Sequence, residues 1–344
     1  MEDRGKNRSD VKFTDLDVLS ADLNVNNHEN FNAELCFSRY AMDYVLKKYS
    51  KLPDDFKIHA LLEHGVIITE YVGGAFRAHE YLPSIVSSKY RVGILEREKN
   101  FNGAFAIGPY IHYVNSLLDH DQFKMEKERL GKSLLVFPTH SIDGSISKFD
   151  YNGFSNEIKK YSDDFDSVRI CMYYKDIQLG RHKFYQKEGF EVVTAGHFND
   201  LNFLPRLRSI IELSDMTMSN DVGTHLGYCI YLNKPHFIDL KQNAKHIAEK
   251  DDRNSKLMMD NTKIVEDVKN KNDNVRNINN LFSVFDENIT KDQYDLISYL
   301  WGFDEVKTPD ELKNLFLKIN EDFSWIKYYT SALSRLKTII FNGR

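Results

Sequence analysis

Residues 216–239, MTMSNDVGTHLGYCIYLNKPHFID, contain the pattern that decides the fold. An apolar strand runs to position 218, a turn of small and polar residues follows, and a helix continues until Pro235, which cannot extend it. A second buried strand is expected over 236–240. The turn holds residue types that cap helices, namely Ser219, Asn220 and Asp221. The stretch therefore predicts a strand–helix–strand unit of an α/β protein.

The start of this predicted helix is suited to hold an anion. Gly223 and Thr224 lie in its first turn, where free backbone N–H groups and the positive end of the helix dipole meet. Together with Ser219 and Asn220 they are candidate ligands of a phosphate. The alternative is an ordinary capped helix that binds nothing, which is the commoner case in α/β proteins.

Size and composition narrow the class of protein. The chain has 344 residues, enough for two domains of ordinary size. The net charge of -5 argues against a dedicated nucleic-acid binder, which usually carries a basic excess. No apolar run approaches the ~20 residues that cross a bilayer, and the polar N-terminus is unlike a signal peptide. We therefore expect a cytoplasmic protein.

Two short segments of the first half are candidates for strands. The first, over 58–62, runs directly into Glu63, His64 and Gly65. The second, over 103–113, ends in a Gly-Pro pair. Ligands gather at the carboxyl ends of strands in open α/β sheets, so Glu63 and His64 are candidate catalytic groups. A local turn without function is an equally weighted alternative, and Glu70 is a weaker candidate carboxylate.

Polar residues follow four predicted strands of the second half. These strands cover 133–137, 167–174, 190–194 and 215–219, and helical segments separate them. The polar residues after them are His140 with Ser141, Lys175, His197 and Ser219. A parallel sheet brings such strand ends to the same rim. This predicts a ligand cleft. For His225, inside the helix, local structure is the favoured interpretation, and the same holds for His59, His112 and His236.

The last hundred residues have a different pattern. The polar segment 241–280 permits no clear assignment. Helices with capping boxes are expected after Thr290 and Thr308, and a last helix over 322–341. Trp325 and the basic residues near it leave open a peripheral contact with a membrane, although a helix packed on the protein is favoured.

The central stretch resembles the donor-phosphate segment of GT-B glycosyltransferases of bacterial surface-polysaccharide synthesis. The similarity lies in the Ser-Asn turn, the Gly223-Thr224 pair and the Asn-Lys-Pro ending. It implies an α/β fold of two Rossmann-like domains that face a cleft, with a helical C-terminal tail. The expected division is a polar N-terminal arm (1–30), an acceptor-side domain (31–125), a nucleotide-sugar-binding domain (126–245), and a polar segment with C-terminal helices (246–344).

The resemblance implies a glycosyltransferase that moves a sugar from a CMP-, UDP- or GDP-linked donor to a glycan or lipid-linked acceptor. No Asp-x-Asp triplet follows a predicted strand, so we expect a reaction without a metal and without a cofactor. The base is expected to be His64 or Glu63. The donor nucleotide is expected to contact His140, Ser141, Lys175, His197, Ser219, Asn220, Gly223 and Thr224.

Three other functions remain open from the sequence. The same fold is used by sugar-nucleotide 2-epimerases and by polyol-phosphate transferases. A nucleotide-binding scaffold without activity is a third alternative. The His-Pro order of enzymes that use CMP-linked acidic sugars is absent, since Pro138 precedes His140 here. The donor base is therefore not assigned.

Overall fold

The second half of the chain forms a five-stranded parallel sheet around β4, which is buried along its whole length. The computed structural model describes residues 8–23, 39–73, 76, 81–99, 101–242 and 244–323. The strands lie in the order β7-β6-β4-β8-β9. Their bounds are β4 (Ser133–Phe137), β6 (Ser167–Cys171), β7 (Glu191–Val193), β8 (Met216–Ser219) and β9 (His236–Ile238).

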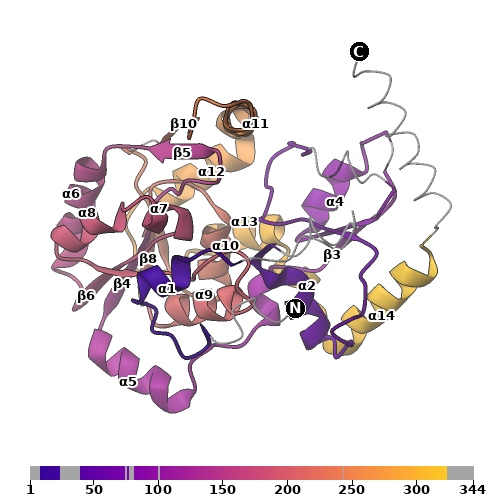
Figure 1. Cartoon of the computed structure of the whole chain (residues 1–344), viewed down its shortest axis with the longest axis horizontal. Helices are drawn as coiled ribbons and strands as arrows, with labels where there is room; N and C mark the ends of the chain where they lie inside the picture. Colours follow the sequence, from indigo (N-terminus) through magenta and orange to yellow (C-terminus); the bar gives the residue numbers. More distant parts are fainter. Residues whose placement is uncertain are drawn as a thin grey trace.

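This strand order has a topological switch between β4 and β8. The chain adds strands on one side of β4 first and then returns to add β8 and β9 on the other side. The connections that follow β4 and β8 lead away from each other, and this leaves a crevice at the carboxyl ends of the two strands. The helices of this unit are α5 (His120–Leu130), α6 (Tyr151–Ser162), α7 (Tyr174–Gln178), α8 (His182–Lys187), α9 (Phe203–Glu212) and α10 (Thr224–Tyr231), and Figure 1 shows them around the sheet.

A smaller parallel sheet belongs to the first half. It has the order β1-β2-β3. Its strands are β1 (Leu61–Leu62), β2 (Ser84–Val86) and β3 (Ala104–Ala106), and its helices are η3 (Arg39–Ala41), α2 (Met42–Tyr49), α4 (Lys89–Leu95) and η4 (Tyr110–Tyr113). A single apolar cluster joins the two units, because Leu46 and Ile85 of the first share it with Phe137 and Tyr228 of the second. The predicted fold class, two Rossmann-like units that face each other, is confirmed.

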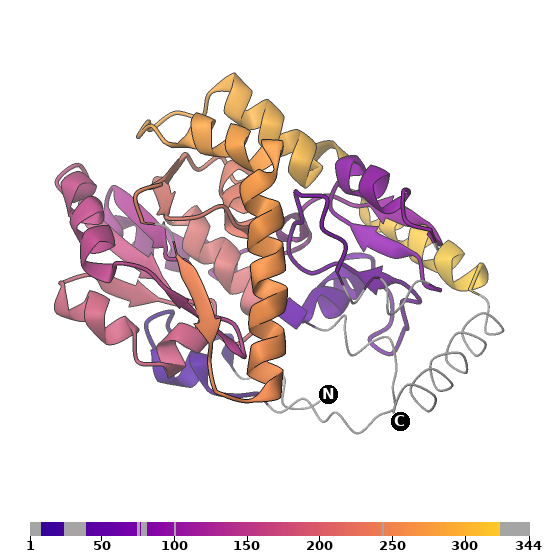
Figure 2. The same ribbon diagram turned by 90° about the horizontal axis from the view of Figure 1, so that it is seen from above.

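The C-terminal helices cross from the second unit to the first. Capping boxes at Thr290 and Thr308 start α13 (Lys291–Trp301) and α14 (Pro309–Glu321), as predicted. Helix α13, followed by η5 (Phe303–Glu305), contacts both α10 and α4, and α14 contacts α2 (Figures 1 and 2). The expected helix over 322–341 lies outside the described residues from position 324 onward, and so does Trp325.

Two polar segments have regular structure in the described residues. The N-terminal arm, which the sequence describes only as polar, contains α1 (Leu16–Ser20), which packs on α7, and the amide of His197 donates to the carbonyl of Leu19 at 2.9 Å. The polar segment 241–280 is ordered into β10 (Lys245–Ala248), α11 (Arg253–Lys271) and α12 (Asp273–Phe282). Strand β10 pairs antiparallel with β5 (Ser145–Lys148), and α11 runs along the side where the units meet (Figure 2).

Close packing of α10 on α13 depends on Gly227. A Cβ atom there would overlap the ring of Trp301, whose Nε1 donates to the Thr224 carbonyl at 3.2 Å. We expect Gly227→Ala to lower the free energy of unfolding by about 1–3 kcal/mol, because the buried ring must shift. Gly93→Ala in α4 is the matched control, since its Cβ meets nothing within 4 Å and alanine favours a helix. Urea unfolding measures both, and an unchanged Gly227→Ala variant would contradict this packing.

Candidate functional site

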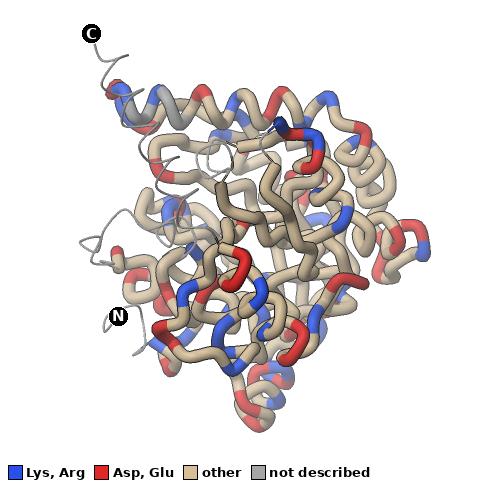
Figure 3. The backbone as a smooth tube through the Cα atoms, turned by 90° about the vertical axis from the view of Figure 1, so that its right-hand side faces the viewer, with Lys and Arg blue, Asp and Glu red and all other residues tan. Residues whose placement is uncertain are grey.

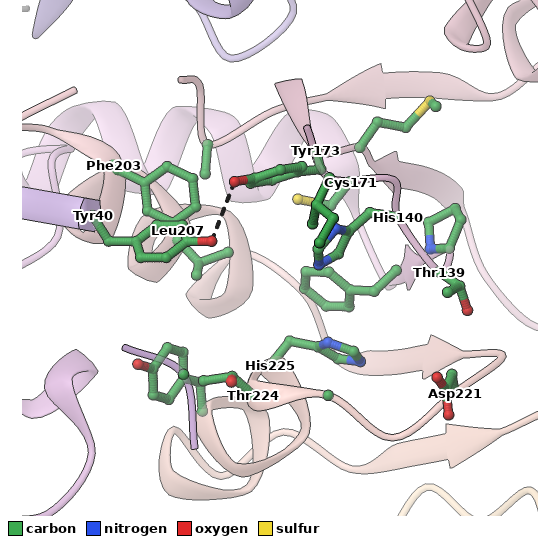
Figure 4. A pocket seen from close by; sticks show the side chains of 18 of the residues that line it. Tyr40, Thr139, His140, Cys171, Tyr173, Phe203, Leu207, Asp221, Thr224 and His225 are labelled. Atoms are coloured by element: carbon green, nitrogen blue, oxygen red, sulfur yellow. Dashed lines mark hydrogen bonds between the residues drawn. The ribbon is translucent and has the colours of Figure 1, made fainter. Parts of the chain in front are cut away.

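A cavity of about 350 Å³ lies at the switch between β4 and β8. The second unit lines it with residues that follow these strands, such as Thr139, His140 and Asp221, and with Phe203 and Leu207 of α9 (Figure 4). The first unit contributes its own wall from η3, α2 and the loop after β1, namely Tyr40, Met42, His64 and Gly65. Both units therefore close on the same space.

The N-terminus of α10 opens into this cavity without a side-chain cap. Its N-cap residue is Gly223, and no side chain accepts a hydrogen bond there. The predicted capping residues make other contacts. The Ser219 hydroxyl donates to the Asp221 carbonyl at 2.8 Å, and the Asn220 Oδ1 accepts from the Thr139 amide at 2.8 Å. None of the described residues accepts from the Thr224 or His225 amide, so both N–H groups are available to a ligand.

Thr224 ties the two units together at this helix end. Its Oγ1 accepts a hydrogen bond from the Val66 amide at 3.0 Å. The preceding Gly65 has φ +77°, and a Cβ atom there would lie 3.4 Å from the same Oγ1. Glycine adopts this left-handed conformation at no steric cost. The turn thereby brings His64 to the cavity opposite α10.

His225, which the sequence favoured as a local structural residue, lies in the cavity wall. Its ring stacks on Phe137 with the centroids 4.7 Å apart (Figure 4). Its Nε2 is buried and has no partner among the described residues. Burial lowers the pKa of His225 to about 3, and nearby His140 acts in the same direction. The imidazole is neutral at pH 7 in the free protein.

Two of the three histidines predicted for the site, His140 and His64, reach the cavity. The ring of His140 packs on Tyr173 with centroids 4.5 Å apart, and its Nδ1 lies 3.1 Å from the Ser141 carbonyl. A carbonyl only accepts, so Nδ1 carries the proton and Nε2 is the nitrogen left for a ligand. Nε2 of His64 lies 3.5 Å from Nη1 of Arg39. Burial and the nearby guanidinium lower the pKa of His64 to about 4.

Glu63 does not reach the cavity. Its carboxylate is held by Arg91, whose Nε and Nη2 lie 2.9 and 2.7 Å from Oε1. The Arg91 side chain is 1% exposed and that of Glu63 14%. Burial raises the pKa of Glu63, and Arg91 opposes this shift. A carboxylate fixed in such a pair serves the fold of the first unit, so the ion pair does not favour Glu63 as the base.

Of the eight predicted nucleotide ligands, His140, Gly223 and Thr224 line the cavity, whereas Ser141, Lys175, His197, Ser219 and Asn220 do not. Ser141 is buried and donates to Asp176 Oδ1 at 2.8 Å. Lys175 lies in α7, which begins soon after β6, and it pairs with Glu249 at 2.9 Å. His197 is buried against the ring of Tyr174, 4.4 Å away. The short connection from β6 into α7 places Lys175 within the helix and not at the end of the strand.

The inner part of the cavity is apolar and contains two tyrosines that the sequence did not single out. The Tyr40 and Tyr173 hydroxyls are 3.2 Å apart, from different units (Figure 4). Cys171 lies beside them, and burial raises the pKa of its thiol to about 12, so it is no nucleophile at neutral pH.

His246 of β10 also lines the cavity and was missed because its polar segment has no readable periodicity.

No family model matches the chain, and no curated protein matches its sequence. Among solved structures, UDP-GlcNAc 2-epimerase from Neisseria meningitidis bound to UDP-GlcNAc is similar at 13% identity with a TM-score of 0.30. The match covers 81% of this chain and 80% of that one. Within the described part of the chain, no helix has the length and hydropathy to cross a membrane.

We expect Glu63→Gln to destabilise the protein by about 3–5 kcal/mol, because it leaves Arg91 charged and buried beside a neutral amide. The matched control is Glu70→Gln, since Glu70 and Arg97 are both 70% exposed and 3.6 Å apart. That pair contributes at most about 1 kcal/mol. Denaturant unfolding compares the two variants. A stable Glu63→Gln protein that has lost only its activity would instead support the catalytic role.

Proposed function

We propose that the cavity binds the nucleotide-sugar donor of a glycosyltransferase, with the phosphate at the start of α10. The observation that carries this proposal is the N-terminus of α10 at the β4–β8 switch, which has no side-chain cap. The first unit contacts this helix end through the hydrogen bond from the Val66 amide to Thr224. Helix N-termini hold phosphate through free N–H groups and a positive dipole. The switch point is where open α/β sheets bind ligands.

The proposed roles follow from the position of each residue. The Thr224 and His225 amides donate to the phosphate, and His140 lines the same space from the end of β4. The apolar wall around Phe203 and Tyr173 receives the sugar or the base. These groups offset the negative charge that develops on the leaving nucleotide. Stabilising this charge is the main requirement for transfer of the sugar to a hydroxyl group. His64 faces the acceptor side.

We expect a thermal-shift screen with CMP, CDP, UDP, GDP and ADP to raise the unfolding midpoint with at least one of them, because a ligand that binds only the native state stabilises it. We expect the apparent affinity for the nucleotide, obtained from this thermal shift, to be at least tenfold lower in His140→Ala and in Thr224→Val. His120→Ala is the control, since this exposed residue begins α5, and none of the residues of α5 lines the cavity.

The products then separate the related functions. Transfer to an added glycan or release of the nucleotide supports a transferase, an isomerised sugar nucleotide without an acceptor indicates an epimerase, and binding without turnover indicates a scaffold. A polyol-phosphate transferase would instead turn over CDP-glycerol. If no nucleotide shifts the midpoint at millimolar concentration, the proposal fails.

Donor binding is expected to tighten as the pH falls from about 6 toward about 4. His225 and His64 are neutral in the free protein, with pKa values lowered to about 3 and about 4. A bound phosphate raises these pKa values and so favours proton uptake, which makes the affinity rise toward acid by up to tenfold per pH unit for each proton. Calorimetry with an intact sugar nucleotide tests this, because its phosphodiester does not titrate there. His225→Phe keeps the stack on Phe137 and is expected to flatten the slope; a flat wild-type profile would contradict the role of the histidines.

A further inference from the structure

We propose that His246 is the general base of this site and that Glu266 is its positioning residue. The inference rests on the proposed function, because it assigns the proton acceptor for the hydroxyl that attacks the donor sugar. His246 lies in β10 and Glu266 in α11, a part of the chain that also forms one edge of the cavity.

Strand pairing fixes which way His246 faces. It stands opposite Ser147 of β5, with Lys245 and Ile247 on either side in the strand. Lys245 and Ile247 are exposed, whereas the side chain of His246 is only 12% exposed and lines the cavity. Alternate residues of a strand point to opposite faces. The pairing of β10 with β5 therefore holds the imidazole toward the ligand space.

A carboxylate fixes the tautomer of this imidazole. His246 Nδ1 is hydrogen-bonded to Glu266 Oε1, and an ionised carboxylate can only accept. Nδ1 therefore carries the proton, and Nε2 carries the lone pair that can take another. The negative charge also stabilises the imidazolium that forms when Nε2 is protonated. A base oriented by a third group in this way is the arrangement found in catalytic dyads and triads.

The other cavity imidazoles lack this support. His64 faces the guanidinium of Arg39, which opposes protonation, and burial lowers its pKa to about 4. His225 is packed on Phe137, and His140 donates a hydrogen bond from Nδ1 to the Ser141 carbonyl. Among the described residues that line the cavity, His246 is the imidazole with a carboxylate partner. The sequence-based choice of His64 thus fits a binding contact better than a base.

Charged groups of both signs surround His246 and Glu266. Helix α11 carries both signs along its length (Figure 3), and its Lys269 is paired with Asp221 of the cavity rim at 2.6 Å. The β5 side presents Lys148 opposite Lys245, both with exposed side chains. His140 and His225 are the titratable groups of the remaining wall. Glu266 is therefore the anion in direct contact with the imidazole.

The step balances without a further reactant. The acceptor oxygen forms its bond to the anomeric carbon of the sugar while its proton moves to Nε2 of His246. The bond from that carbon to the phosphate oxygen breaks, and the electron pair leaves with the nucleotide. The proton later passes from the imidazolium to solvent. Positioned bases of this kind contribute about 10²–10⁴-fold to a rate.

The test measures nucleotide release from UDP-N-acetylglucosamine, CMP-N-acetylneuraminate and GDP-mannose, with water or a glycan as acceptor. We expect His246→Ala to lower kcat by about 10²–10⁴-fold while the thermal shift by the nucleotide persists. Added imidazole is expected to restore part of this rate. Lys245→Gln, on the opposite face of the same strand, is the control and is expected to keep the wild-type rate.

Glu266→Gln separates catalysis from structure, because the amide oxygen can still accept from Nδ1 while the charge is lost. We expect at least a tenfold lower kcat and an acid limb of kcat/KM moved to lower pH, since the imidazolium loses its neighbouring anion. Unchanged rate and pH profile in Glu266→Gln, or a fully active His246→Ala, would overturn the assignment and leave the nucleotide site intact. Binding without turnover in the wild type would also overturn it. Absence of any binding would remove the proposed function itself.

Discussion

The hydrogen bond from the Val66 amide to the Thr224 hydroxyl is the constraint on which the site depends. It fixes the first unit against the start of α10, and the Gly227–Trp301 contact presses the body of the same helix against α13. The helix is therefore held from two sides, and its free N–H groups open into the cavity. A backbone dipole that is held this rigidly costs no reorganisation when an anion arrives, which is why such ends serve as phosphate sites.

Burial divides the histidines of this cavity by role. His225 and His64 are kept neutral, so they can accept a charge only when a ligand supplies the opposite one. His246 instead is hydrogen-bonded to the carboxyl group of Glu266. The contrast is physical, because desolvation opposes a charged imidazole and a carboxylate favours it. The proposed reaction accordingly separates anion binding at the start of α10 from proton transfer at His246.

The sequence predicted the second unit well and the site only in part. Strand β4 and the capping boxes at Thr290 and Thr308 were readable because apolar runs and caps are local patterns. The sequence placed Lys175 at a strand end because it does not show how soon α7 begins after β6. It gave no sign of the ion pair of Glu63, because only the fold brings Arg91 next to that residue. His246 could not be found, since its place depends on the pairing of β10 with a strand about a hundred residues earlier.

The central claim is that an anionic ligand meets the first amides of α10. The most direct measurement is an NMR titration of protein labelled with ¹⁵N at threonine and histidine, using the nucleotide with the largest thermal shift. The account expects the Thr224 and His225 amides to show the largest downfield changes, because each donates to the phosphate. Saturable binding that leaves these two amides unchanged, with the largest changes elsewhere, would contradict it.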